Sequence, residues 1–241
     1  CGCMNDYGRY FMLWERWWEN GYDCVCEEEN VITCIAVTGP PQIEEPCDEF
    51  GPGYKWVLRA GVWGCYCVEY YCLDLTVCFA WGDPHYYLFD GSEHHFQGAC
   101  RYTLAKDYGT SCDFVVEAQN QPVPVTPQYT FVSDVYVEAY GCTIGMHQGR
   151  LVTVDGVLYT PPFSKALGKI QVGLGGLSVH VWLVNYGVIV AYDGVTHVTV
   201  AVPNDYHGQM CGLCGNFNGN PFDDFMKPDG TIVGDVNIFG N

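Results

Sequence analysis

Side chains that carry oxygen ligands gather near the end of the chain. Carboxylate or amide oxygens stand at Asn216, Asn218 and Asn220, and then at Asp223 and Asp224. Calcium in proteins takes about six to eight oxygen ligands, and alternating Asn and Asp residues around a glycine turn can supply them. The same composition is typical of a surface turn in which Asn and Asp hydrogen-bond their own backbone. Spacing alone favours the calcium site and the plain turn equally.

The two cysteines before this loop, Cys211 and Cys214, are separated by two residues. Redox and zinc sites share this spacing. A zinc site of this kind needs a second pair and a redox motif needs an α/β setting, and the sequence offers neither. We interpret the pair as halves of two structural disulfides.

The tripeptide Asp83-Pro84-His85 is a second candidate for chemistry. An Asp–Pro peptide is acid-labile, because the Asp carboxyl can attack its own carbonyl carbon and the protonated proline nitrogen leaves. A neighbouring histidine can supply the proton, and an ordinary imidazole pKa of ~6.5 places its charging just below neutral pH. Taken alone, the motif is more often a turn that enters a strand.

The pair His94-His95 is a weak candidate for metal binding, because adjacent residues of a strand point to opposite faces. No Ser/His/Asp or Cys/His nucleophile arrangement stands at a recognisable motif. The sequence therefore predicts no enzyme activity on a substrate. Self-cleavage at Asp83–Pro84 is the one reaction that stays open.

Strands must position these groups. The chain has 29 glycines and 13 prolines, which favour turns and short strands. Apolar residues alternate from 172 to 202, and Asp155-Gly156 between apolar runs is a hairpin signal. We expect an all-β fold, an antiparallel sandwich or meander with short helices and one face of each sheet buried. Residues 105–112 and 122–127 are predicted to be connections.

Cysteine usage indicates the compartment and the domain boundary. Fifteen cysteines without paired zinc spacings favour a secreted, disulfide-bonded protein, and the odd number leaves at least one without a partner in the chain. Nine lie in residues 1–77, a region too short for a large core. We therefore predict a small disulfide-rich module at 1–77 and a β domain at 78–241. The start at Cys1, without a signal peptide, suggests a segment of a longer secreted protein.

Charge excludes two classes of partner. Acidic residues number 28 and basic ones 10, giving a net charge of −18. Nucleic acid and anionic membrane surfaces repel such a chain. No apolar run reaches the ~18 residues that a membrane span needs, so direct insertion is not expected.

Together the motifs resemble the von Willebrand factor type D domain, from about Cys78 to Asn241. The motifs that carry the resemblance are Gly82-Asp83-Pro84-His85, Phe89-Asp90-Gly91, Phe96-Gln97-Gly98 and Cys211-Gly212-Leu213-Cys214-Gly215-Asn216-Phe217-Asn218-Gly219. The end of the chain looks like a point where that family continues into a further cysteine-rich module, so the domain is expected to be truncated there. Residues 1–77 are similar to the cysteine-rich linker, a TIL/E or VWC-like module, of tectorin-, zonadhesin-, Fc-binding- and gel-forming mucin-like proteins. That similarity is carried by Cys1-x-Cys3, Cys24-x-Cys26 and Gly61-Val62-Trp63-Gly64-Cys65.

The resemblance implies a Ca²⁺ ion. The ligands carried over are Asp90, Asn216, Asn218, Asp223 and Asp224, with a main-chain carbonyl near Asn220. Asn218 stands where the family often has Asp, which lowers the ligand charge.

The resemblance also implies two disulfides, Cys78–Cys214 and Cys112–Cys211. It pairs Cys100 with a cysteine beyond the chain and leaves Cys142 without a partner. Relatives that carry the tetrapeptide are cleaved at the bond that corresponds to Asp83–Pro84.

The function that follows is a calcium-binding structural module of a large secreted, extracellular glycoprotein that assembles filaments, mucus-like gel or matrix. Its partners would be other copies of the protein, as a homo-oligomer or polymer, or other extracellular glycoproteins. An adhesive glycoprotein-binding module is the alternative, which an exposed aromatic patch at 14–18 would favour. A protease inhibitor is a further alternative and would need a rigid exposed loop, for which 37–46 is the candidate.

Overall fold

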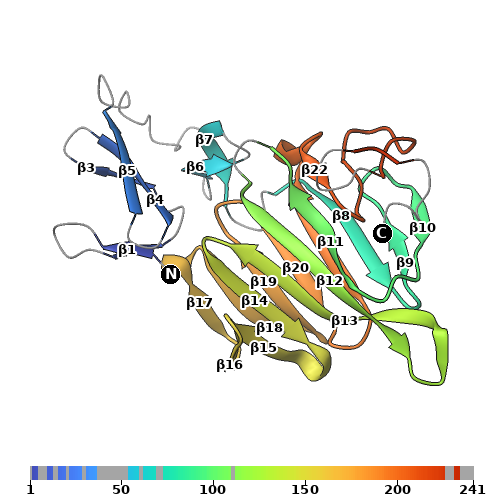
Figure 1. Ribbon diagram of the computed structural model, residues 1–241. Coiled ribbons are helices and arrows are strands. Elements are labelled where there is room, and N and C mark those ends of the chain that lie inside the picture. Colours follow the sequence, from blue (N-terminus) through green and yellow to red (C-terminus); the bar gives the residue numbers. More distant parts are fainter. Residues whose placement is uncertain are drawn as a thin grey trace.

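The computed structural model describes residues 2–4, 10–12, 16–19, 22–28, 31–36, 54–59, 62–68, 73–109, 112–225 and 231–233. The predicted all-β, antiparallel fold is confirmed: strands pair antiparallel throughout, and the helical elements of the described part are single 3-10 turns (Figure 1). None of these helical turns is long and apolar enough to cross a membrane.

Two large sheets make up the body of the molecule. The eight-stranded sheet has the order β10-β9-β8-β21-β20-β19-β18-β17, and the seven-stranded sheet has the order β16-β15-β14-β13-β12-β11-β22. The strands of the first are β8 (Leu75–Trp81), β9 (His85–Tyr87), β10 (Glu93–His95), β17 (Phe163–Lys165), β18 (Ile170–Gly175), β19 (Ser178–Leu183), β20 (Val188–Tyr192) and β21 (Val198–Pro203). The strands of the second are β11 (Arg101–Asp107), β12 (Phe114–Val123), β13 (Thr126–Ala139), β14 (Cys142–His147), β15 (Leu151–Val154), β16 (Val157–Tyr159) and β22 (Met210–Cys211). The 3-10 turns are η3 (Gln148–Arg150), η4 (Ala166–Gly168) and η5 (Asn204–Tyr206).

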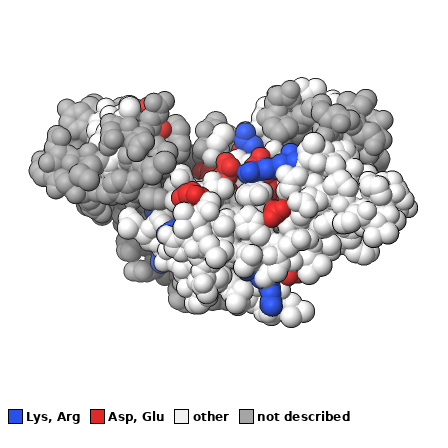
Figure 2. Space-filling view, turned by 60° about the horizontal axis from the view of Figure 1, so that its bottom comes forward, with Lys and Arg blue, Asp and Glu red and all other residues white. Residues whose placement is uncertain are grey.

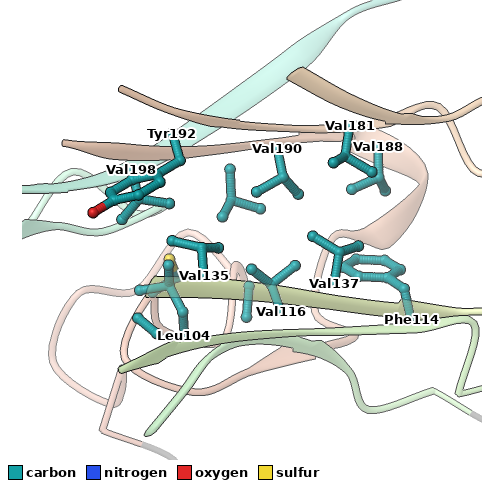
Figure 3. Close-up of a cluster of buried hydrophobic side chains, with 14 of the residues drawn as sticks. Leu104, Phe114, Val116, Val135, Val137, Val181, Val188, Val190, Tyr192 and Val198 are labelled. Atoms are coloured by element: carbon teal, nitrogen blue, oxygen red, sulfur yellow. The ribbon is translucent and has the colours of Figure 1, made fainter. Parts of the chain in front are cut away.

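The two sheets face each other across one core. Figure 3 shows Val181 and Val190 of the larger sheet pointing toward Val116 and Val137 of the smaller one. These four side chains are fully buried, and burying one aliphatic side chain contributes about 1.5–3 kcal/mol. The hydroxyl of Tyr192 lies 3.0 Å from the carbonyl oxygen of Val132, so one polar contact also joins the layers.

The strand pattern matches the sequence where pairing is local. Strands β18 to β21 form the expected meander, and Asp155-Gly156 turns between β15 and β16 with positive φ at both residues, 49° and 80°. The predicted connections are wrong in part: 105–107 continues β11, and in 122–127 only 124–125 is turn. Pairing with a distant segment explains β11, because Lys106 pairs with Cys211 of β22 as well as with Val115 of β12.

The first part of the chain forms three small sheets. Their strands are β1 (Gly2–Met4), β2 (Tyr10–Met12), β3 (Arg16–Glu19), β4 (Tyr22–Glu28), β5 (Val31–Ala36), β6 (Tyr54–Arg59) and β7 (Val62–Cys67). In Figure 1 the β6–β7 hairpin lies between β3, β4 and β5 and the sandwich. Disulfides join Cys3 to Cys26 and Cys24 to Cys34. The predicted boundary at 77/78 falls inside β8, whose pairing with β21 already begins at Leu75. Trp14 and the segment 37–46 lie outside the described residues, as do the side chains of Trp17 and Trp18.

Candidate metal centre and the Asp83–Pro84 turn

The loop that follows β22 folds back onto the turn between β9 and β10. The carboxylate of Asp90 in that turn accepts hydrogen bonds from the backbone N–H of Asn218 at 3.0 Å and of Gly219 at 2.8 Å. The N–H of Phe89 donates to the carbonyl of Cys214 at 3.0 Å. The predicted loop and Asp90 are therefore brought together, although they lie far apart in sequence.

Asp224 lies on the inner side of the loop and is only 3% exposed. Its carboxylate accepts hydrogen bonds from the Ser92 hydroxyl at 2.8 Å and from the N–H of Asn216 at 3.2 Å. Burial raises the pKa of Asp224 to about 6, and the nearby Asp90 carboxylate adds to the rise, whereas the two hydrogen bonds oppose it. Negative charge on Asp224 and Asp90 at the same time is therefore unfavourable unless a cation compensates it.

Asp223 holds the outer side of the loop together. Its carboxylate accepts hydrogen bonds from the side-chain amides of Asn216, Asn218 and Asn220 at 2.9, 3.1 and 3.0 Å. These bonds lower the pKa of Asp223, that from Asn216 most. The amide oxygen of Asn216 is buried and has no hydrogen-bond partner among the described residues. A buried acceptor of this kind is costly unless a ligand satisfies it.

All six predicted ligand residues converge here, and their chemistry fits calcium. The donors are hard oxygens from three carboxylates and several amides, which is the set that calcium prefers. Among the described residues no three His, Cys, Asp or Glu side chains form a metal-binding group, so the carboxylates alone do not make a cage. Amide oxygens must contribute, and those of Asn218 and Asn220 would have to turn, because their NH₂ groups now face Asp223.

His94 forms part of the floor beneath this loop. Its ring stacks on Tyr86 with centroids 4.8 Å apart and meets Phe225 edge-on at 5.4 Å. Its Nε2 lies 3.0 Å from the carbonyl oxygen of Leu213 and carries the ring proton. Burial lowers the pKa of His94 to about 4, so the ring is neutral at physiological pH. His95 is exposed on the opposite face, as the alternation of a strand requires.

The Asp83–Pro84 bond lies in the tight turn between β8 and β9. His85 Nε2 is 2.8 Å from Asp83 Oδ1, so the carboxyl and the imidazole that the sequence singled out are in contact. His85 Nδ1 is 2.7 Å from His95 Nδ1 across the β9–β10 pair. The side chain of Gln97 donates a hydrogen bond to the carbonyl oxygen of Asp83. Sequence reasoning missed both residues, because the His95 contact depends on the pairing of β9 with β10 and the Gln97 contact joins two segments that only the tertiary fold brings together.

One of the two implied disulfides is present. Cys78 is bonded to Cys214, which anchors the loop to β8. Cys112 and Cys211 are separate thiols, which contradicts the second pairing. The exposed Cys112 has a positive φ of 46° and its Sγ turns toward the carbonyl of Gly109, whereas Cys211 is buried and burial raises its pKa to about 11. Cys100 and Cys142 are also thiols.

Comparison with known proteins agrees with this geometry. The family model of the von Willebrand factor type D domain matches residues 78–231. Human zonadhesin is 35% identical over 240 residues, covering 98% of this chain and 8% of zonadhesin. Human IgGFc-binding protein is 37% identical over 253 residues, covering all of this chain and 4% of that protein, and human alpha-tectorin is 35% identical over 241 residues, covering 95% and 10%. The chain thus spans about a tenth or less of these relatives, and it belongs to the von Willebrand factor type D family.

Proposed function

We propose that this chain is a calcium-stabilised structural module of a large secreted, extracellular glycoprotein that builds filaments, gel or matrix. Its partners would be further copies of the protein, as a homo-oligomer or polymer, or other extracellular glycoproteins. Similarity to zonadhesin and alpha-tectorin supports a multidomain structural or adhesive role. On the described part of the face in Figure 2, few side chains are charged and acidic ones lie next to basic ones, which suits association with proteins better than with a polyanion.

The observation that carries the calcium proposal is the orphaned amide oxygen of Asn216 beside the buried Asp224. A divalent cation would satisfy that acceptor and offset the repulsion between Asp224 and Asp90. It would thereby hold the loop, which Cys78–Cys214 already ties to β8, against the β9–β10 turn. Calcium that binds only the folded state stabilises it by about 2.7 kcal/mol at one hundred times its dissociation constant.

Thermal unfolding in calcium and in a chelator tests this proposal. We expect chelation to lower the melting temperature by roughly 5–10 °C, the shift that ~2.7 kcal/mol produces in a domain of this size. The near-isosteric variant Asp224→Asn should lose most of that difference. Glu93→Gln is the matched control, because Glu93 is exposed and lies on β10 near the loop. Equal melting of the unaltered chain in both buffers contradicts the proposal.

The contact between His85 and Asp83 favours a second activity, self-cleavage of the Asp83–Pro84 bond. The Asp83 carboxyl would attack its own carbonyl carbon, and His85 would protonate the leaving proline nitrogen. The fragments would stay joined through Cys78–Cys214, so cleavage is visible only after reduction. We expect two fragments on a reducing gel after days at pH 5.5. At pH 7.5 a smaller fraction of the chain should be cleaved. A single band at both pH values contradicts self-cleavage.

A further inference from the structure

We propose that Gln97 is a catalytic residue of the Asp83–Pro84 cleavage, in which its side-chain amide binds the oxyanion that forms on the Asp83 carbonyl oxygen. The inference rests on the self-cleavage proposed above and assigns a role to a residue that the calcium site does not use. Three segments meet at the bond: the turn itself, strand β9 with His85, and the segment 96–99 with Gln97.

The orientation of the Gln97 amide is set by its second partner. Its Oε1 accepts a hydrogen bond from the backbone N–H of Thr130 at 2.8 Å, and the Thr130 hydroxyl lies 3.4 Å away. An N–H group can face only the oxygen end of an amide, so the NH₂ end must face Asp83. Strand β13 of the opposite sheet, which carries Thr130, therefore fixes a donor on the scissile carbonyl.

Packing also fixes the segment that carries Gln97. Phe96 is buried, and its ring meets that of Tyr102 edge-on with centroids 4.9 Å apart. A Cβ at Gly98 would overlap both of these side chains, so a larger residue there would displace them. In the motif Phe96-Gln97-Gly98, Phe96 anchors the segment in the core, Gln97 supplies the hydrogen-bond donor, and Gly98 allows the rings of Phe96 and Tyr102 to pack closely against the backbone.

The donor touches the atom on which charge develops. Attack by an Asp83 carboxylate oxygen forms a C–O bond at the carbonyl carbon and moves an electron pair onto the carbonyl oxygen. Collapse of this intermediate breaks the C–N bond; the proline nitrogen takes a proton from the His85 imidazolium, and Asp83 is left as a five-membered cyclic anhydride. One water then opens the anhydride to two carboxyl groups and returns the proton. A hydrogen bond to the carbonyl oxygen is stronger in the charged intermediate than in the peptide, so it accelerates the reaction.

Contacts on both ring nitrogens fix the position of the His85 imidazole. Nε2 faces the Asp83 carboxyl, Nδ1 faces His95, and the Trp81 ring lies 4.9 Å from the imidazole centroid. The Asp83 carboxyl, the His85 imidazole and the Gln97 amide are therefore held around the Asp83–Pro84 turn before reaction. Such preorganisation removes reorientation from the barrier.

Cleavage rates of the whole chain at pH 5.5 test the role of Gln97. The variants are Gln97→Ala and the near-isosteric Gln97→Glu, which keeps the shape of the side chain but loses the N–H donors. Loss of one oxyanion donor from a closed site costs about 100- to 1,000-fold, so in this half-open turn we expect a fall of roughly 10- to 100-fold. Gln148→Ala, at an exposed glutamine of η3, is the control and should cleave like the unaltered chain.

Trapping with hydroxylamine shows at which step of the cleavage Gln97 acts. Because Gln97 acts before the anhydride forms, the ratio of hydroxamate to acid at Asp83 should stay constant while the total rate falls. A chain that is not cleaved at all overturns both self-cleavage and this inference. A chain that is cleaved, with Gln97→Ala and Gln97→Glu within twofold of its rate, overturns the role of Gln97 alone. Slower cleavage with a changed ratio also overturns that role.

Discussion

The cysteine-rich region and the sandwich are both built from antiparallel strands, yet different interactions hold them. The sandwich buries a continuous layer of aliphatic side chains between two sheets. In the described part of the cysteine-rich region, the buried cluster consists of the bonded pair Cys3 and Cys26 with Ile32 packed against it. A chain segment too short for a large core replaces apolar burial with covalent crosslinks. Strand content alone therefore says little about what stabilises a region.

The two regions meet at a buried cation. Arg59 of β6 is 2% exposed and donates hydrogen bonds to the Asp205 carboxylate at 3.0 Å and to the carbonyl of Asn185 at 3.2 Å. Gly187 lies beside it at a φ of 69°, where a Cβ would meet Arg59 and Pro203. The β6–β7 hairpin is thus fastened to the sandwich by an ion pair between a buried guanidinium and a partly exposed carboxylate.

The largest effect should come from the core of the sandwich. Leu183→Ala removes a fully buried side chain and leaves a cavity, so we expect a loss of about 2–5 kcal/mol in the free energy of unfolding. Leu158→Ala is the control at an exposed position and should change it by about 0.5 kcal/mol or less. Denaturant unfolding in saturating calcium measures both. Similar losses in the two variants would contradict the assignment of the sandwich's stability to its buried aliphatic core.

The second effect should be confined to the other region. Replacing Cys3 and Cys26 together by serine opens a link with a sequence separation of 23, worth about 3 kcal/mol in the chain-entropy model. Hydrogen exchange should then speed up in β4 and β5 and stay unchanged in β19 and β20. Faster exchange in all four strands would show that the regions unfold as one unit.

The smallest effect should appear as a pH dependence at His94. Its pKa is about 4 in the folded chain and ordinarily ~6.5, so the unfolded chain takes up a proton first on acidification. The stability that this neutral ring contributes is complete above pH ~6.5 and is lost as the pH falls toward 4, by about 2 kcal/mol at pH 5. His94→Phe should flatten the slope of stability between pH 7 and pH 5. Asp224, whose raised pKa acts in the opposite sense, is present in both chains and cancels. Equal slopes would contradict the assignment.

Local patterns predicted the strands of the meander, the Asp155-Gly156 turn and the residues that meet in the loop after β22, where a calcium site is proposed. These features follow from side-chain alternation, from turn chemistry and from motif resemblance. The pairing of β11 with β22 was not predictable, because it joins segments about a hundred residues apart. The contact of Gln97 with Asp83 has the same origin. Both depend on strands that are distant in the sequence, β22 for the first and β13 with Thr130 for the second, and no local spacing records them.

The Cys78–Cys214 bond has a mechanical consequence. It joins β8, the first strand of the sandwich, to a point 136 residues later in the chain. Tension that enters from the cysteine-rich region reaches Cys78 three residues after β8 begins, and the disulfide passes it directly to Cys214. Roughly 450 Å of extended chain is shielded from the pull. The strands between Cys78 and Cys214 therefore carry no tension while the disulfide is intact. Reduction of this one bond would expose the whole segment to the pull and allow it to extend.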